Sequence, residues 1–559
     1  MYYALERLVG PHSANLIKPP KEEIRFRQDL PSLPVWHTPR WTARLSDLSK
    51  GVFGHLNEEH KLGFINPNWG LEGLRAGRLW AMTLHYHKWL FTLAELSVTG
   101  DEESERAMAL FEHYLQDWLA RYASGMKDAS NFAWNSYAVA TRISWWVSSH
   151  DLLASAKRML DPDLQKSFLE TLWNQAAYLS CHLEYDLRGN HLLRDALGLA
   201  YAGRFLQGSQ PRRWLETATT LALDQCREQV LRDGGHFERS VMYHVDAMED
   251  ILTLSILTED KQASSELKKT WLRMANFLAW ARHPDGMIPL FNDSALNGSC
   301  TPEQMLTSGM LVDCRVNPSP KRGGKLFPDY GLVCWHDDVW TIFFDVGCVG
   351  VDYQPGHCHA DTLSIEVSYK GQRLFVDPGT WGYDLDDRRN YDRSTRSHNT
   401  VCVDGLDSCE VWHIFRCGRR AYPESVEVRE RSNGFTASAG HTGYRHLPGG
   451  PRPWREVTLH GDQRLVIRDR CDGEGAHRLS GGWLLGPGWE VKPSDGGWRV
   501  YRPELGALNI RVQGPPGIKL DLSPRWYHPE FGMEMVTRRL AWTVETELPA
   551  EITTVHEAE

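Results

Sequence analysis

The chain has 559 residues, with 62 lysines and arginines against 72 aspartates and glutamates, and its formal net charge is −10 at pH 7. That length exceeds one simple core and predicts two or three structural units, while 42% hydrophobic and 24% charged residues exclude a disordered chain, a collagen-like repeat and a small disulfide scaffold. The acidic balance argues against broad nucleic-acid binding, although a local basic cleft on such a protein can still take an anionic substrate.

The first segment, residues 1 to about 65, is expected to be irregular. Five prolines from Pro19 to Pro39 interrupt any long helix, and the segment also carries Trp36 and Trp41. Because a free linker would have little use for two tryptophans, we expect residues 1–65 to form an ordered arm packed on the next domain.

Neither a targeting segment nor a membrane span is expected. The N-terminal residues Met1–Arg7 contain no uninterrupted apolar region, and no later stretch reaches the ~18 apolar residues that a span needs. The 11 cysteines are scattered from Cys181 to Cys471 without CxxC pairs, which does not fit a small disulfide framework. We therefore expect a cytoplasmic protein, or a periplasmic or secreted one if a leader was removed.

Residues 66–320 show the apolar periodicity of α-helices. Leu110, Tyr114, Trp118 and Tyr122 fall on one stripe, and further periodic segments are separated by short Pro- or Gly-containing breaks. Helices joined by short loops are antiparallel neighbours, which predicts either a bundle or a ring of helical hairpins.

After about residue 320 the apolar period becomes two. Ile365, Val367 and Tyr369 alternate with polar residues ahead of a turn, and residues 457–467 form a second expected hairpin. This pattern predicts an antiparallel β-sandwich over residues 321–559. The fold class that we expect is therefore α+β and multidomain, with a helical domain before a β domain.

Two histidines and an aspartate in the β domain form the strongest candidate metal site. His357 and His359 would point to the same face of an extended strand. His359, Asp377 and His398 supply two imidazoles and one carboxylate from neighbouring β segments, a donor set suited to zinc. The metal could be catalytic or structural, and a buried network of hydrogen-bonded histidines without a metal is the alternative.

A second cluster lies in the helical domain. Asn190 and His191 fall where one helix is expected to end and another to begin, so both could project into a cleft. Further along, a glycine pair precedes closely spaced Arg239, Tyr243 and His244, a composition typical of a loop-borne site. For either histidine taken singly, a helix cap or a core position is the alternative interpretation.

Arginines and tryptophans indicate where an anionic sugar could bind. Four arginines from Arg388 to Arg396, Arg393 among them, surround Tyr391 in an expected loop, where they could hold carboxylates or sulfates bidentately. The 23 tryptophans could be platforms for sugar rings or core residues. Trp134, in an aromatic run of the helical domain, fits both interpretations equally.

These motifs resemble those of the heparinase II/III-like polysaccharide lyases, a superfamily that includes oligoalginate and heparan sulfate lyases. The resemblance covers most of the chain from about residue 40. It is most specific in residues 189–191, in residues 233–244, and in the series His357-x-His359-Ala360-Asp361, Asp377-Pro378-Gly379 and Ser397-His398-Asn399-Thr400. It implies an incomplete (α/α) toroid followed by an antiparallel β-sandwich, and β-elimination in uronate-containing polysaccharides.

The resemblance also implies catalytic roles. Asn190 would neutralise the uronate carboxylate, and His191 would be a candidate base. Tyr243 would be the catalytic tyrosine, and His357 would help to bind the carboxylate. Whether His191 or Tyr243 removes the proton stays open.

Binding roles are expected for a second group of residues. His359, Asp377 and His398 would hold a structural zinc ion in the β domain. The expected substrate-binding residues are Trp134, Arg239, His244, Tyr391 and Arg393.

Two departures from the family pattern bear on the substrate. Some members carry a carboxylate one helical turn after the histidine, where this chain has Arg194, and members are commonly exported. We expect an acidic polysaccharide or oligosaccharide as the partner, with a homodimer left open. A zinc-dependent glycan hydrolase and a non-catalytic carbohydrate-binding protein of exopolysaccharide metabolism are the alternative functions.

Overall fold

The structure is a computed structural model that describes residues 24–27, 44–122, 132–316, 321–431 and 434–559. The chain divides into two compact units, and each draws on more than one stretch of sequence. The first comprises Met1–Glu228, Glu249–Trp271 and Met310–Cys314, and the second comprises Gln229–Met248, Leu272–Gly309 and Arg315–Glu559.

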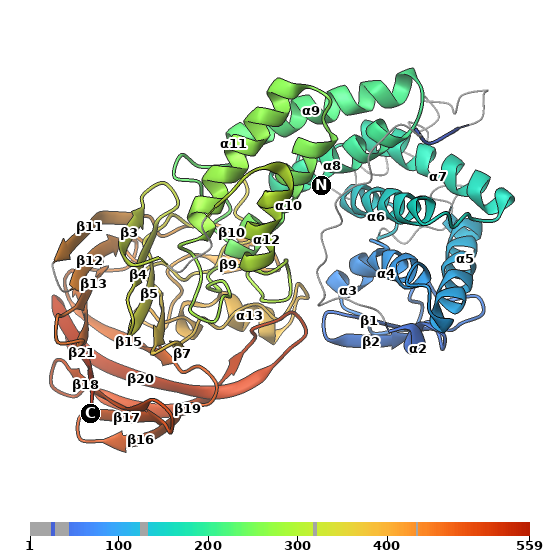
Figure 1. Ribbon diagram of the computed structural model, residues 1–559. Helices are drawn as coiled ribbons and strands as arrows, with labels where there is room; N and C mark the ends of the chain where they lie inside the picture. The colour runs from blue at the N-terminus through green and yellow to red at the C-terminus, as the bar shows by residue number, and fades with distance from the viewer. Residues whose placement is uncertain (1–23, 28–43, 123–131, 317–320, 432–433) are drawn as a thin grey trace. The chain divides into compact units, whose positions relative to one another are not determined.

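Helices dominate the chain up to residue 312, as the periodicity predicts (Figure 1). The first unit also contains a short antiparallel pair of strands, β1 (Val52–His55) and β2 (Glu58–Lys61). No helix in the described part of the chain combines the length and apolar character that crossing a bilayer requires. The helices are α2 (Leu45–Leu48), α3 (Arg78–Leu84), α4 (Lys88–Ser97), α5 (Glu102–Tyr122), α6 (Ser136–Ser155), α7 (Pro162–Cys181), α8 (Gly189–Phe205), α9 (Ser209–Gln229), α10 (Val241–Leu257), α11 (Lys261–Leu278), α12 (Pro302–Ser308) and the 3-10 helix η3 (Gly309–Val312).

Capping side chains fix where several helices begin. The Asn135 side chain accepts a hydrogen bond from the backbone of α6, and Asp161 does the same for α7, with Pro162 in the first turn. Thr301 and Gln304 form a reciprocal capping box on α12. The proline-containing break before α7 is therefore a capped helix start.

The first unit is held by close helix packing and by one buried cation. A Cβ atom at Gly198 of α8 would lie 2.6 Å from Cα of Ala140 on α6, so only glycine permits this helix crossing. Arg142 is fully buried and donates to the side chain of Gln175 and to the backbone carbonyl of His85. These bonds replace part of the hydration that the guanidinium loses on burial.

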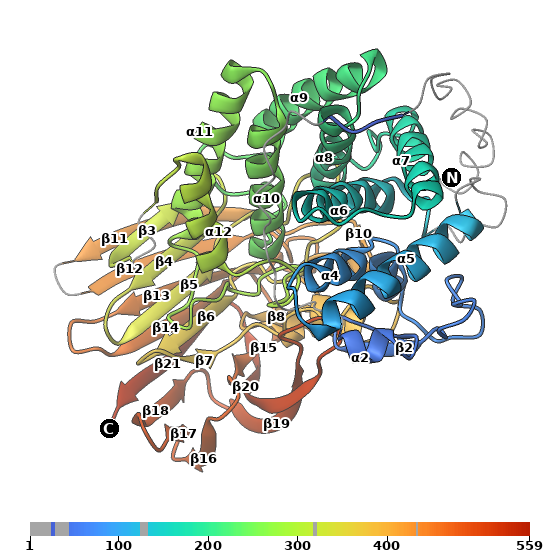
Figure 2. The same ribbon diagram turned by 45° about the vertical axis from the view of Figure 1, so that its right-hand side comes forward.

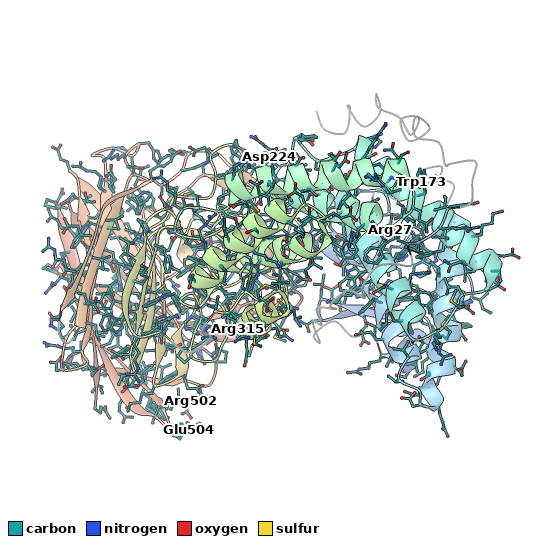
Figure 3. All side chains as sticks on the ribbon, turned by 45° about the horizontal axis from the view of Figure 1, so that its top comes forward. Arg27, Trp173, Asp224, Arg315, Arg502 and Glu504 are labelled. Carbon is teal, nitrogen blue, oxygen red and sulfur yellow. The ribbon has the colours of Figure 1, made fainter. Side chains whose placement is uncertain are left out.

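Most tryptophans fill cores. Fifteen of the 21 tryptophans in the described residues are buried, which favours the core interpretation for those fifteen. Trp173 on α7, labelled in Figure 3, has its ring centroid 4.9 Å from that of Trp214 on α9. Trp412 is the contrasting case, with 51% of its surface exposed.

Only part of the predicted N-terminal arm is described. Phe26 bridges to Leu206 as an isolated antiparallel pair, and Arg27 forms an ion pair with Glu259, with 2.7 Å between Nη1 and Oε1. Trp36 and Trp41, on which that prediction rested, lie outside the described residues.

Antiparallel strands dominate the second unit, as the period of two predicts (Figure 2). Three large sheets have the orders β11-β12-β13-β14-β21-β18-β17-β16, β19-β20-β15-β8 and β3-β4-β5-β6-β7, and β9 pairs with β10. The strands are β3 (Gly323–Phe327), β4 (Leu332–His336), β5 (Trp340–Asp345), β6 (Ile365–Tyr369), β7 (Gln372–Phe375), β8 (Cys402–Val403), β9 (Val411–Trp412), β10 (Arg416–Cys417), β11 (Pro423–Arg431), β12 (Gly434–His441), β13 (Arg452–Leu459), β14 (Leu465–Asp472), β15 (Ala476–Leu484), β16 (Glu490–Ser494), β17 (Gly497–Arg502), β18 (Gly506–Gln513), β19 (Lys519–Tyr527), β20 (Met535–Glu547) and β21 (Ala550–Ala558).

One apolar core joins the three large sheets. It contains Ile365 of β6, Phe435 of β12 and Trp483 of β15, so inward-facing residues of all three sheets pack together. Both expected hairpins, β6–β7 and β13–β14, are present. The polar residues that alternate with the apolar ones in β6 are also buried, which the sequence pattern did not indicate. One of them, Glu366, lies 3.1 Å from Nε2 of His283.

Buried histidines make the stability of the first unit sensitive to acid. Burial, with a contribution from neighbouring cations, lowers the pKa of His55 and of His85 to about 3. The unfolded chain takes up these protons near pH 6.5, so the free energy of unfolding should fall as pH drops below that value, by about 1.4 kcal/mol per pH unit for each histidine at most. Urea denaturation between about pH 7 and about pH 5 measures this slope, and unchanged stability over that window would contradict the prediction.

Candidate active site

The start of α10 is tied to a loop that carries an acidic side chain. The Ser240 hydroxyl accepts a hydrogen bond from the backbone N–H of Tyr243, with a distance of 3.2 Å. The same hydroxyl donates to the backbone carbonyl of Asp293 at 2.7 Å. One serine therefore caps the helix and fixes the position of Tyr243 relative to Asp293.

The Asp293 carboxylate is the centre of the site. Its Oδ2 lies 3.0 Å from Nδ1 of His357, and its Oδ1 lies 2.8 Å from Nε2 of His359. Arg389 donates to both oxygens in a bidentate ion pair. Burial alone would raise the pKa of Asp293, but the Arg389 charge and the hydrogen bonds from His357 and His359 hold it well below its usual range. The group is therefore an anion that orients two imidazoles.

Tyr243, Tyr383 and the partly exposed His357 are the groups of this cluster that could contact a ligand or transfer a proton. The hydroxyls of Tyr243 and Tyr383 are 2.8 Å apart, and the rings of Tyr243 and His357 are 4.0 Å apart between centroids. His357 keeps 16% of its side chain exposed, whereas Asp293 and Arg389 are fully covered. A ligand could thus reach His357, while the charges behind it are shielded from water.

Two residues next to the site adopt the left-handed backbone conformation. Arg239 has φ +60° and Asn292 has φ +58°. The Asn292 side chain donates to the Arg239 carbonyl and accepts from the backbone N–H of His359, with both distances 3.0 Å. Its own N–H donates to Asp361 at 3.1 Å. These bonds stabilise a strained loop beside the imidazoles, a situation common at functional sites.

The expectation that His357 and His359 lie in an extended strand is wrong. They belong to an irregular segment between β5 and β6. His357 and His359 nevertheless converge, because both bind the two oxygens of one carboxylate, Asp293. Cys358 between them is buried among small apolar side chains.

A three-residue group in the second unit is arranged to hold a metal ion. Ligand atoms of His359, Asp377 and His398 all lie within 4.8 Å of one another, and all three residues are buried. Among the described residues, Nδ1 of His359 and Nε2 of His398 have no hydrogen-bond partner. The ring of His359 is held through Nε2 by Asp293, and the ring of His398 is held through Nδ1 by Asp377. Two imidazoles and one carboxylate match the donor types of a metal site.

Asn190 and His191 belong to the first unit and occupy the first turn of α8, as expected. Nδ1 of His191 lies 3.1 Å from Oε2 of Glu184, and 29% of the His191 side chain is exposed. Arg194, the residue that departs from the family pattern, forms an ion pair with Asp250. Burial raises the pKa of Asp250 to about 7 although Arg194 opposes this shift.

The structure places the five expected substrate-binding residues in different environments. Trp134 and His244 are buried, and Nε2 of His244 lies 3.2 Å from the carbonyl of Met274. Tyr391 donates its hydroxyl to a backbone carbonyl, and Arg393 is buried against several carbonyls. The half-buried guanidinium of Arg239 lies over the ring of Tyr330, 6.0 Å from its centroid. Their roles towards a substrate stay predictions.

The arginine-rich segment is not the loop that was expected. Its residues form the short helix α13 (Asp387–Arg393) followed by the 3-10 helix η4 (Thr395–Ser397). Asp386 caps α13 through the backbone N–H of Arg389. Arg388 pairs with Glu534 at 2.8 Å, while Arg389 faces Asp293.

Sequence reasoning missed Asp293, Tyr383 and Arg389 as members of one cluster. Asp293 follows an apolar run inside an irregular segment that has no periodic pattern. The available signal was its neighbour Asn292, because asparagine is a residue type that tolerates the left-handed backbone conformation. Tyr383 lies just after the Asp377-Pro378-Gly379 motif, where an isolated aromatic residue in a loop was the available signal.

Family models match nearly the whole of the described chain. A model of the heparinase II/III N-terminus matches residues 55–310, and a model of the heparinase II/III-like C-terminal region matches residues 319–555. The chain belongs to the heparinase II/III-like family of polysaccharide lyases.

Two relatives and one solved structure are similar to this chain. A heparin-sulfate lyase of Pedobacter heparinus is 26% identical over 72% of this chain and 62% of that protein, so the chain spans less than two thirds of its length. A heparin-sulfate lyase of Bacteroides stercoris is 24% identical over 79% of this chain and 70% of that protein. A crystal structure of heparinase III shares the fold, with TM-score 0.77, 18% identity, and coverage of 99% of this chain and 90% of that chain.

Removing the charge of Asp293 should destabilise the second unit. In Asp293→Asn the buried Arg389 loses its anion, so we expect the free energy of unfolding to fall by about 3–5 kcal/mol. Urea denaturation measures the change, and the double variant with Arg389→Gln should lose less than the sum of the single changes.

Asp338→Asn is the matched control, because Asp338 also pairs with an arginine but is 75% exposed. It should change stability by about 1 kcal/mol or less. Equal losses in the two aspartate variants would show that the Asp293 pair does not stabilise the fold.

Proposed function

We propose that this protein is a lyase that cleaves a uronate-containing, acidic polysaccharide or oligosaccharide by β-elimination. The observation that carries the proposal is the placement of Tyr243 against His357, with Tyr383 bonded to the first and Asp293 to the second. A phenol beside an oriented imidazole can supply both proton transfer and carboxylate binding. The family membership and the heparin-sulfate lyases among its relatives support this chemistry.

The reaction requires a proton to leave C5 and another to reach O4. Neutralisation of the uronate carboxylate makes the C5 proton more acidic, and the electrons of the C5–H bond form the C4–C5 double bond as the C4–O4 bond breaks. We propose that His357, held by the anion Asp293, donates to the substrate carboxylate. Tyr243 then gives its hydroxyl proton to the leaving O4.

Tyr383 gains a role that the sequence did not indicate. Burial raises its pKa well above the usual value, so its hydroxyl stays protonated and can act as a hydrogen-bond donor to Tyr243. In this proposal Tyr383 is a positioning residue that holds the phenol of Tyr243 and stabilises that oxygen when its proton has left.

The residues of the first unit enter the proposal through the family resemblance. Asn190 would neutralise the uronate carboxylate with its amide, and His191 would be the base that removes the C5 proton unless Tyr243 does so. Nδ1 of His191 beside Glu184 supports the base role, because the carboxylate orients the ring.

For the metal group we propose zinc with a structural role. His359, Asp377 and His398 would hold the ion, and Asp293 would orient His359 from outside, the usual arrangement around a histidine ligand. A bound zinc ion would cross-link the three irregular segments that carry His359, Asp377 and His398.

The sugar and the location are also proposals. Heparin sulfate, a glycosaminoglycan, is the substrate in the names of the relatives, while alginate and exopolysaccharide uronates share the same chemistry. All 11 cysteines lie in the described residues and none is in a disulfide, which supports a reducing, cytoplasmic location.

Activity is tested by the absorbance of the unsaturated product on heparan sulfate, hyaluronan, alginate and other uronates. Tyr243→Phe should lower kcat by about 10²–10⁴-fold because the general acid is lost. Tyr444→Phe is the matched control, since Tyr444 is a buried tyrosine whose hydroxyl donates to the Leu406 carbonyl. It should retain the activity of the parent protein.

Absence of product across the whole panel would overturn the lyase proposal. Substitution of His191 by alanine identifies the base. If product formation survives in His191→Ala and is lost in Tyr243→Phe, Tyr243 serves both proton transfers.

Metal analysis of the purified protein should find about one zinc ion per chain. Loss of the ion by chelation, or in His398→Ala, should lower Tm because the three ligand segments are no longer joined. A chelated protein that keeps its Tm but no longer turns over substrate would instead favour the zinc-dependent hydrolase.

A further inference from the structure

A polar cleft lies on the second unit, next to the site and outside the residues assigned a catalytic role. Its volume is about 290 Å³, and its lining includes Arg389, Arg393, Arg396, Trp412 and His413. The cleft is therefore bounded by α13 and η4 on one side and by the β9–β10 hairpin on the other.

Two buried arginines fasten the hairpin through its backbone. Arg393 donates to the carbonyls of His413 at 3.0 Å and Ile414 at 3.2 Å, and through its other Nη to that of Arg416 at 3.0 Å. Arg389 donates to the carbonyl of Ile414 at 2.8 Å with the same Nη2 that binds Asp293. The hairpin is thus joined directly to the carboxylate that orients His357.

The charges around the cleft leave a positive excess. Arg389 is neutralised by Asp293, but Arg393 has only carbonyls and the Cys358 sulfur as partners and forms no ion pair within the described residues. The exposed Arg396 has Asp407 in the same lining, and Asp407 accepts from the backbone N–H of Thr395. Two guanidinium groups against one carboxylate favour an anion in the cleft.

Trp412 gives the cleft an open aromatic face. Its surface is 51% exposed, and a Cβ at Gly418 would lie 3.1 Å from its ring. One edge of the ring therefore lies close to the backbone of Gly418, where a Cβ would make a tight contact. The rest of the ring is available for stacking, in contrast to the fifteen buried tryptophans.

We infer that this cleft is an additional sugar subsite, in which Arg396 binds the anionic group of a sulfated or uronic sugar and Trp412 stacks on its ring. The inference rests on the proposed function and deepens it. The cleft extends recognition beyond the sugar that is cleaved, because Phe415 of the same hairpin contacts both Tyr383 and His357, with ring centroids 5.2 and 5.9 Å apart. A guanidinium that takes carboxylate or sulfate bidentately suits this role.

The test is calorimetric binding of tetrasaccharides to the full chain carrying Tyr243→Phe, which prevents cleavage. The probes are heparan sulfate and alginate tetrasaccharides, desulfated heparan sulfate tetrasaccharide, and the same desulfated probe with its carboxyls reduced. Arg396→Gln should weaken binding of the anionic probes about tenfold, the effect of one charge-assisted hydrogen bond, and leave any binding of the neutral probe unchanged. Trp412→Ala should weaken binding of all probes by about two- to tenfold.

Two comparisons identify the anion and control for surface charge. A loss confined to the sulfated probe assigns Arg396 to a sulfate, and a loss shared with the desulfated probe assigns it to a carboxylate. Arg429→Gln removes an arginine that is 73% exposed on β11 and should bind as the parent does. Thermal unfolding should be unchanged in all these surface variants, and Trp412→Phe should restore most of the affinity lost in Trp412→Ala.

If Arg396→Gln and Trp412→Ala bind every probe as tightly as the parent, the subsite is refuted while the lyase proposal stands. If the parent protein binds none of the probes and cleaves none of the uronates, the proposed function fails, and the subsite fails with it.

Discussion

The site depends on one buried carboxylate. Asp293 holds His357 and His359 on its two oxygens and is itself held by the bidentate pair with Arg389. A buried carboxylate is stable only when hydrogen-bond donors or cations replace the water that it has lost. His357, His359 and Arg389 do this for Asp293. Its main chain is tied as well, because Ser240 joins the Asp293 carbonyl to the start of α10. Asp293 thus fixes both the orientation of the two imidazoles, through its carboxylate, and the start of the helix that carries Tyr243, through its backbone carbonyl.

His359 belongs both to the cluster around Asp293 and to the candidate metal group of the second unit. Its Nε2 contacts Asp293, and the residue also belongs to the group formed with Asp377 and His398. His357, two residues earlier, shares the same carboxylate but keeps an exposed edge. In the proposed mechanism a structural ion and a substrate-binding imidazole are therefore coupled through a single side chain, and neither can be reoriented independently of the other.

Local patterns predicted the elements of this fold, and distant contacts decided the site. Helix stripes and the β6–β7 hairpin depend on neighbours a few residues apart, and Gly371 at that turn has the positive φ that the turn requires. Asp293 could not be found in this way, because His357 and Arg389 lie 64 and 96 residues away. His357 and His359 were expected to point to the same face of a strand. They do converge, but on the carboxylate of Asp293 in an irregular segment, and a shared carboxylate leaves no periodic pattern in the sequence.

The β9–β10 hairpin is held through its backbone, whereas its exposed side chains form the surface that a ligand would contact. Arg389 and Arg393 bind carbonyl oxygens, which every amino acid supplies, so no side chain between Trp412 and Arg416 is needed for these bonds. Substitutions of the exposed Trp412 and His413 therefore leave these backbone bonds in place, whereas Ile414 is buried and Phe415 packs against Tyr383 and His357. Sequence divergence, or deliberate engineering, at these two exposed positions could therefore change the recognition that we infer for the cleft while the backbone attachment of the hairpin is kept.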